Sequence, residues 1–205
     1  MQNLSNENNR DYDHTNKIMA FDVVGDWFDP KDPKATKIPT TLNPGNEVMT
    51  LTAPKNVKVR NIRVQRTNGQ WSLNGQSWQQ VIDSGYKTVL ANPGLGDTEI
   101  WEIENSSGGW FHPVHIHLVD FKILSRNGRA PFNYELGPKD VVYVGENETV
   151  RVLAKFGPHR GKYMVHCHNL PHEDHDMMHQ FSVGLKDTDI DDNDPIKSDP
   201  PSSDN

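Results

Sequence analysis

Hydrophobic and polar residues alternate with a period of two along much of the chain between residues 47 and 185. The alternation is clearest at residues 57–64, and residues 98–104 are rich in residue types that favour strands. Side chains of a β-strand point alternately to its two faces, so this period predicts strands. Five further short strands are expected at residues 115–124, 140–144, 149–156, 162–168 and 179–183.

Turn signals separate these segments. Asn68-Gly69 and Asn127-Gly128 are typical two-residue turns, and Gly157-Pro158 is another chain reversal signal. Many short strands separated by turns at this spacing are typical of an antiparallel sandwich or barrel. The sequence therefore predicts an all-β fold.

The strand pattern is confined to the middle of the chain. Residues 1–17 are almost wholly polar and are expected to be disordered. Residues 18–46 begin with a short apolar segment, expected to be a strand, and continue as a linker with four prolines, so they are expected to be the end of a preceding domain. Residues 47–185 are expected to form one domain. Residues 186–205 contain seven Asp and two Lys and are expected to be an acidic disordered tail.

Composition argues against several classes of protein. The 205 residues include 21 Lys and Arg against 28 Asp and Glu, and with no basic run this balance argues against a nucleic-acid partner. No stretch approaches the roughly 20 apolar residues of a spanning helix, which argues against an integral membrane protein. Residues 1–10 lack the basic and apolar regions of a signal peptide. Cys167 is the single cysteine, so an internal disulfide is excluded.

Histidine is the unevenly distributed residue. Nine of the ten histidines lie between His112 and His179. Most of them belong to two motifs, HPVHIH at residues 112–117 and HCHNLPHEDHDM at residues 166–177. Outside these motifs, the spacing gives no reason to assign His14, His159 or His179 a role as ligand, and the same holds for His175 within the second motif.

Strand alternation divides the motif residues between two faces. His166 and His168 are expected to point one way and Cys167 the other. His115 and His117 form a second pair on one face of a strand. If the two pairs face each other, they offer four imidazoles to adjacent metal ions.

The opposite face offers a different donor set. Cys167 is expected to meet His112 there, because Pro113 is expected to free His112 from the strand alternation. His172 and Met177 are expected to return to the same point from the following loop. A thiolate, two imidazoles and a thioether form the ligand set of a blue-copper electron-transfer site, with Met as the weak axial ligand. A structural zinc site would more usually recruit further cysteines. The sequence therefore predicts copper.

The covalent chain connects the two faces. Cys167 is bonded through the backbone to His166 and His168, so an electron that arrives on one face has a short path to the other. Such a path couples one-electron donors to a multi-electron acceptor, for which oxygen is the obvious candidate.

These motifs resemble the multicopper oxidases, in particular the branch of bilirubin oxidase and bacterial spore-coat laccase. The resemblance is carried by WEIENSSGGWFHPVHIH at residues 101–117 and HCHNLPHEDHDMM at residues 166–178, and residues 70–76 and 137–142 are also similar. It extends over about residues 17–185. It implies a cupredoxin-type Greek-key sandwich. Independently of the resemblance, Trp71, Trp78 and Trp101 are expected in the core.

The resemblance also implies roles for individual residues. The type 1 copper, which accepts electrons from substrate, would be held by His112, Cys167, His172 and Met177. The type 2 copper would be served by His115, and the type 3 pair by His117, His166 and His168. Glu173 falls at the position of an acid associated with the oxygen-reducing site, so Cys167 and Glu173 are the expected catalytic residues. Trp110 falls where bilirubin oxidases carry a tryptophan near the type 1 site.

The chain departs from the family in its number of histidines. Family members have three cupredoxin domains, and their trinuclear cluster takes eight histidines, four from the first domain and four from the last. This chain carries only the last four. We therefore expect the C-terminal portion of a multicopper oxidase, which holds a type 1 copper but does not reduce oxygen alone.

The reaction that the resemblance implies is one-electron oxidation of phenolic or tetrapyrrole-type substrates coupled to reduction of oxygen to water. The expected partners are a small reducing substrate, oxygen, and either the missing N-terminal cupredoxin domains or a second copy of the chain. A blue-copper electron-transfer module without oxidase activity is the alternative. The location stays open, since the family is often exported and a signal would precede Met1.

Overall fold

The structure is a computed structural model, which describes residues 19, 20, 22, 24, 31, 32, 40 and 46–185. The chain divides into two units, Met1–Asn46 and Glu47–Asn205. The expected strand and linker within residues 18–46 and the two ends expected to be disordered lie wholly or mostly outside the described residues. These expectations stay predictions.

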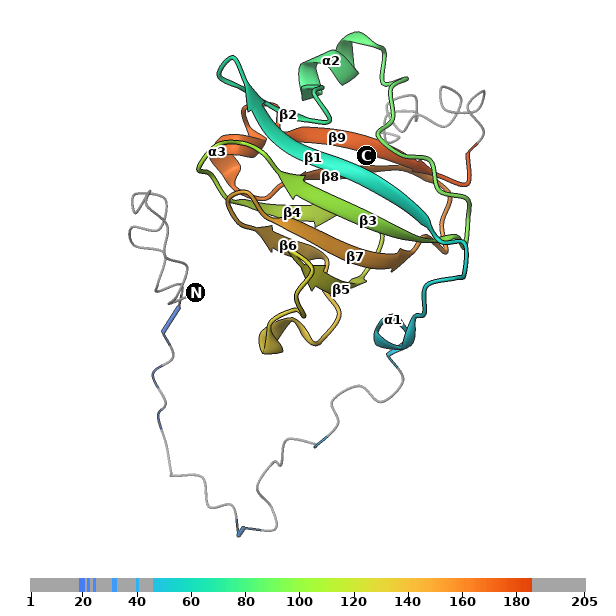
Figure 1. The fold of residues 1–205 in the computed structure, drawn as a ribbon, viewed down its shortest axis with the longest axis vertical. Coiled ribbons are helices and arrows are strands. Elements are labelled where there is room, and N and C mark those ends of the chain that lie inside the picture. Colours follow the sequence, from blue (N-terminus) through green and yellow to red (C-terminus); the bar gives the residue numbers. More distant parts are fainter. Residues whose placement is uncertain are drawn as a thin grey trace, which may run out of the picture. The chain divides into compact units, whose positions relative to one another are not determined.

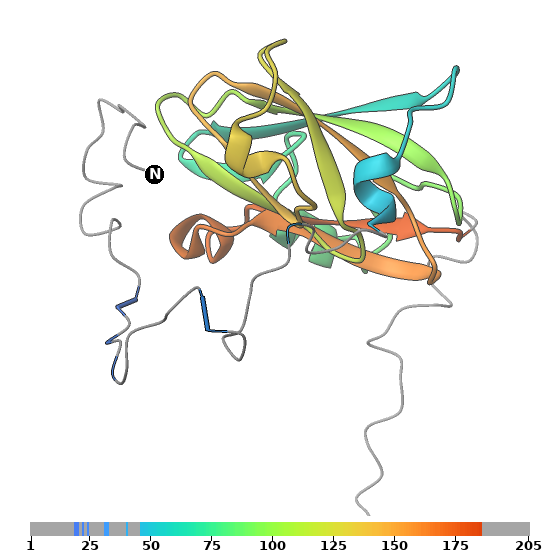
Figure 2. The same cartoon turned by 90° about the horizontal axis from the view of Figure 1, so that it is seen from below.

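Two β-sheets form the described part of the second unit (Figure 1). The first sheet has the strand order β2-β1-β3-β7-β5, with β1 at Lys58–Thr67, β2 at Gln70–Leu73, β3 at Thr98–Asn105, β5 at Phe121–Arg126 and β7 at Thr149–Lys155. The second has the order β6-β4-β8-β9, with β4 at His112–Ile116, β6 at Val141–Val144, β8 at Gly161–Cys167 and β9 at Met178–Val183. Figure 2 shows β8 and β9, in orange and red, in a layer below the strands of the first sheet. The predicted all-β sandwich is confirmed.

One strand pair departs from the expected antiparallel arrangement. β1 and β3 run parallel, with Lys58 opposite Glu99 and Val64 opposite Asn105, while the other paired strands are antiparallel. Parallel neighbours need a crossover connection. Residues 68–97 supply it, and they contain β2 and a helix.

Short helices join the strands. The helix of the crossover, α2, spans Trp78–Asp83 and begins at a capping box, in which Ser77 and Gln80 exchange hydrogen bonds between side chain and backbone. The others are α1 at Glu47–Thr50, the 3-10 helix η2 at Asn133–Glu135 and α3 at Leu170–Glu173. None was predicted, because each is shorter than two turns and shows no helical period.

The strand expected at residues 115–124 is two strands that belong to different sheets. β4 ends at Ile116, and β5 begins at Phe121. Leu118 between them has a φ of 72°, in the left-handed region, which interrupts the extended backbone. The chain thereby crosses from the second sheet to the first.

The core lies between the two sheets. Trp101 is fully buried, stacks on Phe156 with ring centroids 5.1 Å apart and meets the edge of Phe181 at 5.2 Å. Its indole Nε1 donates to Glu99, which in turn is paired with Arg60. The predicted core position of Trp101 is confirmed, whereas that of Trp78 is wrong: this residue begins the short helix α2 and is only half-buried.

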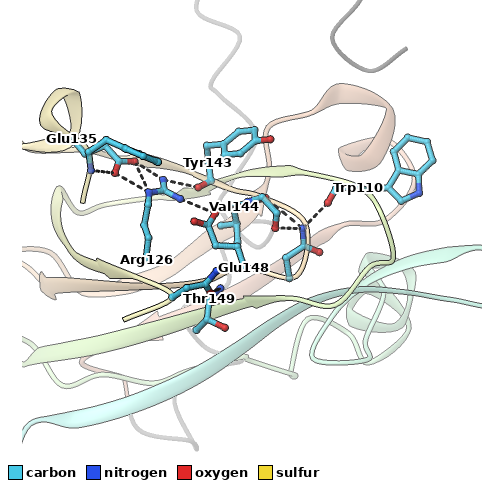
Figure 3. Close-up of polar contacts among 11 residues, drawn as sticks. Trp110, Arg126, Glu135, Tyr143, Val144, Glu148 and Thr149 are labelled. Atoms are coloured by element: carbon cyan, nitrogen blue, oxygen red, sulfur yellow. Dashed lines mark hydrogen bonds and ion pairs between the residues drawn. The ribbon is translucent and has the colours of Figure 1, made fainter. Parts of the chain in front are cut away.

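A buried ion cluster ties the edge of the sandwich together (Figure 3). Arg126, at the end of β5, is paired with Glu135, and both side chains are 5% exposed. Its Nη1 also donates to Glu148 at 2.8 Å, and its Nη2 donates to the carbonyl oxygen of Tyr143 at 2.8 Å. This guanidinium therefore links β5, η2, β6 and the turn before β7.

Loss of one partner from this cluster should destabilise the fold. Glu135→Ala leaves a buried cation undercompensated, and we expect the free energy of unfolding to fall by about 3–5 kcal/mol. Urea unfolding measures the change. Glu104→Ala is the matched control, because it removes only the exposed pair with Arg63 and should cost less than about 1 kcal/mol. Equal losses for the two variants would contradict this account of the cluster.

Candidate metal centre

Strand alternation separates the candidate ligands into two groups. On β4, His112 and Val114 are buried and His115 is half-buried on the other face. β4 pairs with β8 so that Val114 lies opposite Cys167 and His115 opposite His166. Cys167 therefore shares the inner face with His112, and His166 shares the outer face with His115.

The expected effect of Pro113 is wrong. His112 lies within β4, with its Cα opposite Val144 of β6, and does not escape the strand pattern. It precedes His115 by an odd number of positions, so ordinary alternation places the two side chains on opposite faces.

His112, Cys167 and His172 form the inner group, and all three are buried. His112 Nδ1 lies 3.5 Å from Cys167 Sγ, His172 Nδ1 lies 3.7 Å from the same sulfur, and the two Nδ1 atoms are 3.1 Å apart. Nitrogen and sulfur donors about 2.0–2.3 Å from one ion lie roughly 3.3–3.8 Å from one another. The inner group therefore fits a single metal ion.

The turn after β8 brings Met177 back to Cys167. The amide of Cys167 donates to the carbonyl oxygen of Met177 at 3.0 Å. The amide of Met177 donates in turn to the carbonyl oxygen of His172 at 3.0 Å. Met177 is fully buried in the same core cluster as Cys167. The amide of Asn169 points at Cys167 Sγ over 3.4 Å, a contact that favours a thiolate.

Burial sets the protonation of the inner group. Burial, reinforced by the neighbouring His172, lowers the pKa of His112 to about 3. Burial and the charge of Arg66 lower the pKa of His172 to about 4. Burial raises the pKa of the Cys167 thiol to about 12. Without a metal, near neutral pH, both imidazoles are neutral and the thiol keeps its proton.

His115, His117 and His166 form the outer group. The Nε2 atoms of His117 and His166 are 3.1 Å apart, and the ring centroid of His115 lies 4.7 Å from that of His117. His168, the fourth expected ligand on this face, is exposed, with its ring centroid 5.3 Å from that of His166. The structure therefore brings three of the four histidines together and leaves His168 at the rim.

Backbone carbonyls orient two rings of the outer group. His115 Nδ1 lies 2.8 Å from the carbonyl oxygen of Asp140, and His166 Nδ1 lies 3.2 Å from that of Cys167. A carbonyl oxygen only accepts, so each Nδ1 carries the hydrogen and each Nε2 presents a lone pair. Burial lowers the pKa values of His117 and His166, which keeps these rings neutral as ligands.

Glu173 lies beside the outer group. Its Oε1 is 3.3 Å from His166 Nδ1, and its buried Oε2 has no hydrogen-bond partner among the residues that the structure describes. Glu173 and His172 are neighbours on α3, yet His172 belongs to the inner group. A single turn of helix therefore supplies one side chain to each side of β8.

Aromatic rings cover the inner group. Trp71, which we assigned only to the core, is 4% exposed, and its ring centroid lies 4.2 Å from that of His172 and 5.3 Å from that of His112. Trp110 meets His172 edge-on at 5.5 Å. The guanidinium of Arg66 lies over both indoles, 5.0 Å from Trp71 and 5.9 Å from Trp110. The one sequence signal for Trp71 was its place in the family-like segment at residues 70–76.

The remaining histidines that the structure describes belong to neither group. His159 and His175 are exposed. His179 is buried, with its Nε2 2.9 Å from Gln76 Oε1. His14 lies outside the described residues.

A soft sulfur donor with two imidazoles, next to clustered imidazoles on a β-sandwich, is a donor set that suits copper. Residues 49–187 match the family model described as multicopper oxidase. The chain belongs to the multicopper oxidase family. Membership indicates copper as its metal and confirms the cupredoxin-type fold expected from the resemblance.

Individual relatives agree with this family. The chain is 44% identical to a bilirubin oxidase from Albifimbria verrucaria over 84% of this chain and 29% of that protein. It is 33% identical to a laccase from Bacillus subtilis over 61% of this chain and 27% of that protein. A laccase structure from Pediococcus acidilactici superposes with a TM-score of 0.62 at 33% identity, over 73% of this chain and 31% of that one. The chain thus spans less than a third of the length of these relatives.

Among the described residues, there is no helix with both the length and the apolar character needed to cross a membrane.

Metal binding to the inner group should release protons. Co²⁺ is a convenient probe, and at pH 7 we expect about one proton per ion, because the Cys167 thiol must ionise while the neutral His112 and His172 release none. Calorimetric titration in buffers of different ionisation enthalpy measures the number. Cys167→Ala should bind more weakly and release none. Unchanged proton release in that variant would contradict the assignment of the thiol.

Proposed function

We propose that this chain is the copper-binding C-terminal domain of a multicopper oxidase of the laccase or bilirubin oxidase type. The proposed type 1 copper ligands are His112, Cys167, His172 and Met177. The observation that carries the proposal is the connection at β8, where Cys167 of the inner group is bonded directly to His166 of the outer group.

Bound copper would supply the one-electron chemistry, taking electrons from a reducing substrate at the inner group and passing them to oxygen at the outer cluster. The protein's own contribution is to hold neutral imidazoles and a buried thiol in place. Because the inner group is at most 3% exposed, the surrounding side chains exclude water from the metal. The Asn169 amide supports a negative charge on the sulfur.

The cover of the inner group favours aromatic substrates. Trp110, which is half-buried, meets His172 edge-on, and the exposed Arg66 places a positive charge over this indole. Trp71, at 4% exposed, offers no surface to a substrate. A phenol or tetrapyrrole can contact the accessible part of Trp110, and a carboxylate on that molecule would meet the guanidinium of Arg66. We propose donors of this class.

The outer group is the proposed half of a shared cluster. His115 is proposed for the type 2 copper, and His117, His166 and His168 for the type 3 pair. Four further histidines would have to come from other domains of the protein, a separate partner or a second copy of the chain. Glu173, beside His166, is the proposed acid that handles protons near this cluster.

An electron-transfer module without oxidase activity is the alternative. It needs the inner group alone, so the outer group argues against it.

Copper stoichiometry separates these functions. After reconstitution and removal of loosely bound metal, we expect about one copper per chain, with the intense colour of a thiolate-bound type 1 site and no oxygen consumption. Metal analysis and absorption spectroscopy measure both. More than one tightly bound copper, with oxidase activity that rises with chain concentration, would favour pooling of histidines between two copies. Oxidase activity at one copper per isolated chain would contradict a shared cluster.

Two substitutions test the type 1 ligands separately. Cys167→Ser should abolish the blue absorption, because the thiolate donor is lost. Met177→Leu should keep the colour and raise the reduction potential, because only a weak axial donor is lost. A blue Cys167→Ser protein or a colourless Met177→Leu protein would contradict the assignment. Redox titration followed by absorption measures the potential.

A further inference from the structure

The ring nitrogen of His112 that faces away from the inner group has a buried partner. His112 Nε2 lies 2.8 Å from Ser107 Oγ. Ser107 is 7% exposed and His112 fully buried, so no bulk water competes for this contact. A hydroxyl can donate or accept, and the direction of this hydrogen bond decides which ring nitrogen of His112 is protonated.

Asn105 decides that direction. Its Nδ2 atom lies 2.6 Å from the carbonyl oxygen of Trp110, 2.8 Å from that of Gly145 and 3.4 Å from that of Val144. Three carbonyl oxygens around one amide atom identify that atom as the NH2 donor, because carbonyl oxygens only accept. Figure 3 shows these contacts converging from Trp110 and Val144.

The other end of the Asn105 amide is then an acceptor. Asn105 Oδ1 receives the amide hydrogen of Ser107 at 3.0 Å and the hydroxyl hydrogen of Ser107 at 2.7 Å. Since the single hydroxyl hydrogen is used there, Ser107 Oγ must accept from His112. His112 therefore carries its hydrogen on Nε2, and Nδ1 presents a lone pair toward Cys167 and His172.

We propose that Asn105 and Ser107 are positioning residues for the copper centre, which fix the tautomer and the ring orientation of His112. The inference rests on the proposed role of His112 as a copper ligand. It goes beyond that role, because it attributes the tautomer and the orientation of this ligand to two residues that are not themselves ligands.

The buried ion cluster supports the hydrogen bonds that connect Asn105, Ser107 and His112. The amide of Asn105 donates to the carbonyl oxygen of Glu148 at 2.9 Å. Glu148 Oε2 accepts from the amide of Gly145 at 2.7 Å and from Arg126 Nη1 at 2.8 Å. Two of the three carbonyl oxygens that orient Asn105, those of Val144 and Gly145, therefore lie at the turn after β6, which Arg126 holds in place (Figure 3). Supporting hydrogen bonds of this kind hold metal ligands in register.

The copper-free protein provides the first test. With ¹⁵N-labelled histidine, the NMR signals of His112, identified by their loss in His112→Asn, should show a protonated Nε2 and an unprotonated Nδ1. Ser107→Ala should shift His112 to a mixture of both tautomers. Ser107→Thr keeps the hydroxyl and should retain the wild-type pattern. Ser106→Ala, at the exposed neighbouring position, is the matched control and should change nothing.

Copper affinity provides the second test. Competition with a chelator should show affinity about 10- to 100-fold weaker in Ser107→Ala and near wild type in Ser107→Thr and Ser106→Ala. A general loss of structure would weaken Ser107→Thr as well, which separates positioning from folding.

Three results would overturn the proposal. These are a protonated Nδ1 on His112 in the wild-type protein, a Ser107→Ala spectrum with the wild-type tautomer, and an unchanged copper affinity in Ser107→Ala. The wild-type spectrum reports the tautomer of His112 directly, so it tests the proposal even where a variant fails to fold. A wild-type chain with the expected tautomer that binds no copper would instead overturn the proposed function, so the two failures are distinguishable.

Discussion

The pairing of β4 with β8 is the constraint on which both candidate sites depend. Val114 lies opposite Cys167, so the residues that flank this pair fall on fixed faces. The sulfur joins His112 in the dry interior, and His166 joins His115 on the outer side. A slip of one residue would exchange the faces of one whole strand and dismantle both groups. Burial of one face of this strand pair, Val114 included, therefore favours the register that the ligands need.

The two groups differ in the solvent they see, and this difference suits their proposed tasks. The inner group is sealed by the sandwich and by Trp71, so its metal would exchange only electrons with the outside. The outer group is half-buried and borders the exposed His168, so a small molecule can approach it. The step between these environments is one peptide unit long, at His166 and Cys167.

The sequence predicted correctly those features that depend on neighbouring residues of one strand or turn. Alternation around Cys167 predicted the two faces correctly, and the turn at Asn68-Gly69 joins β1 and β2 as a hairpin. The family resemblance added the fold type and the expected ligands. The parallel pairing of β1 with β3 was missed, because it depends on a crossover of some thirty residues whose helix is shorter than two turns.

The contacts that support the ligands could not be found from the sequence. The hydrogen bond between Ser107 and His112 depends on a turn in the Gly-rich segment before β4, and its direction depends on Asn105. Trp71 reaches His172 across a separation of about a hundred residues. A pattern of residue types predicts which face a side chain takes, but it does not specify which distant side chain it will meet.

The shortness of α3 has a consequence for redesign. His172 and Glu173 are adjacent on a helix of four residues, and one faces the inner group while the other faces the outer group. A rotation of this turn that re-angles the imidazole must also move the carboxylate. Substitutions at these two positions are therefore coupled: a change that repositions one side chain also repositions the other, so a redesign has to treat both positions together.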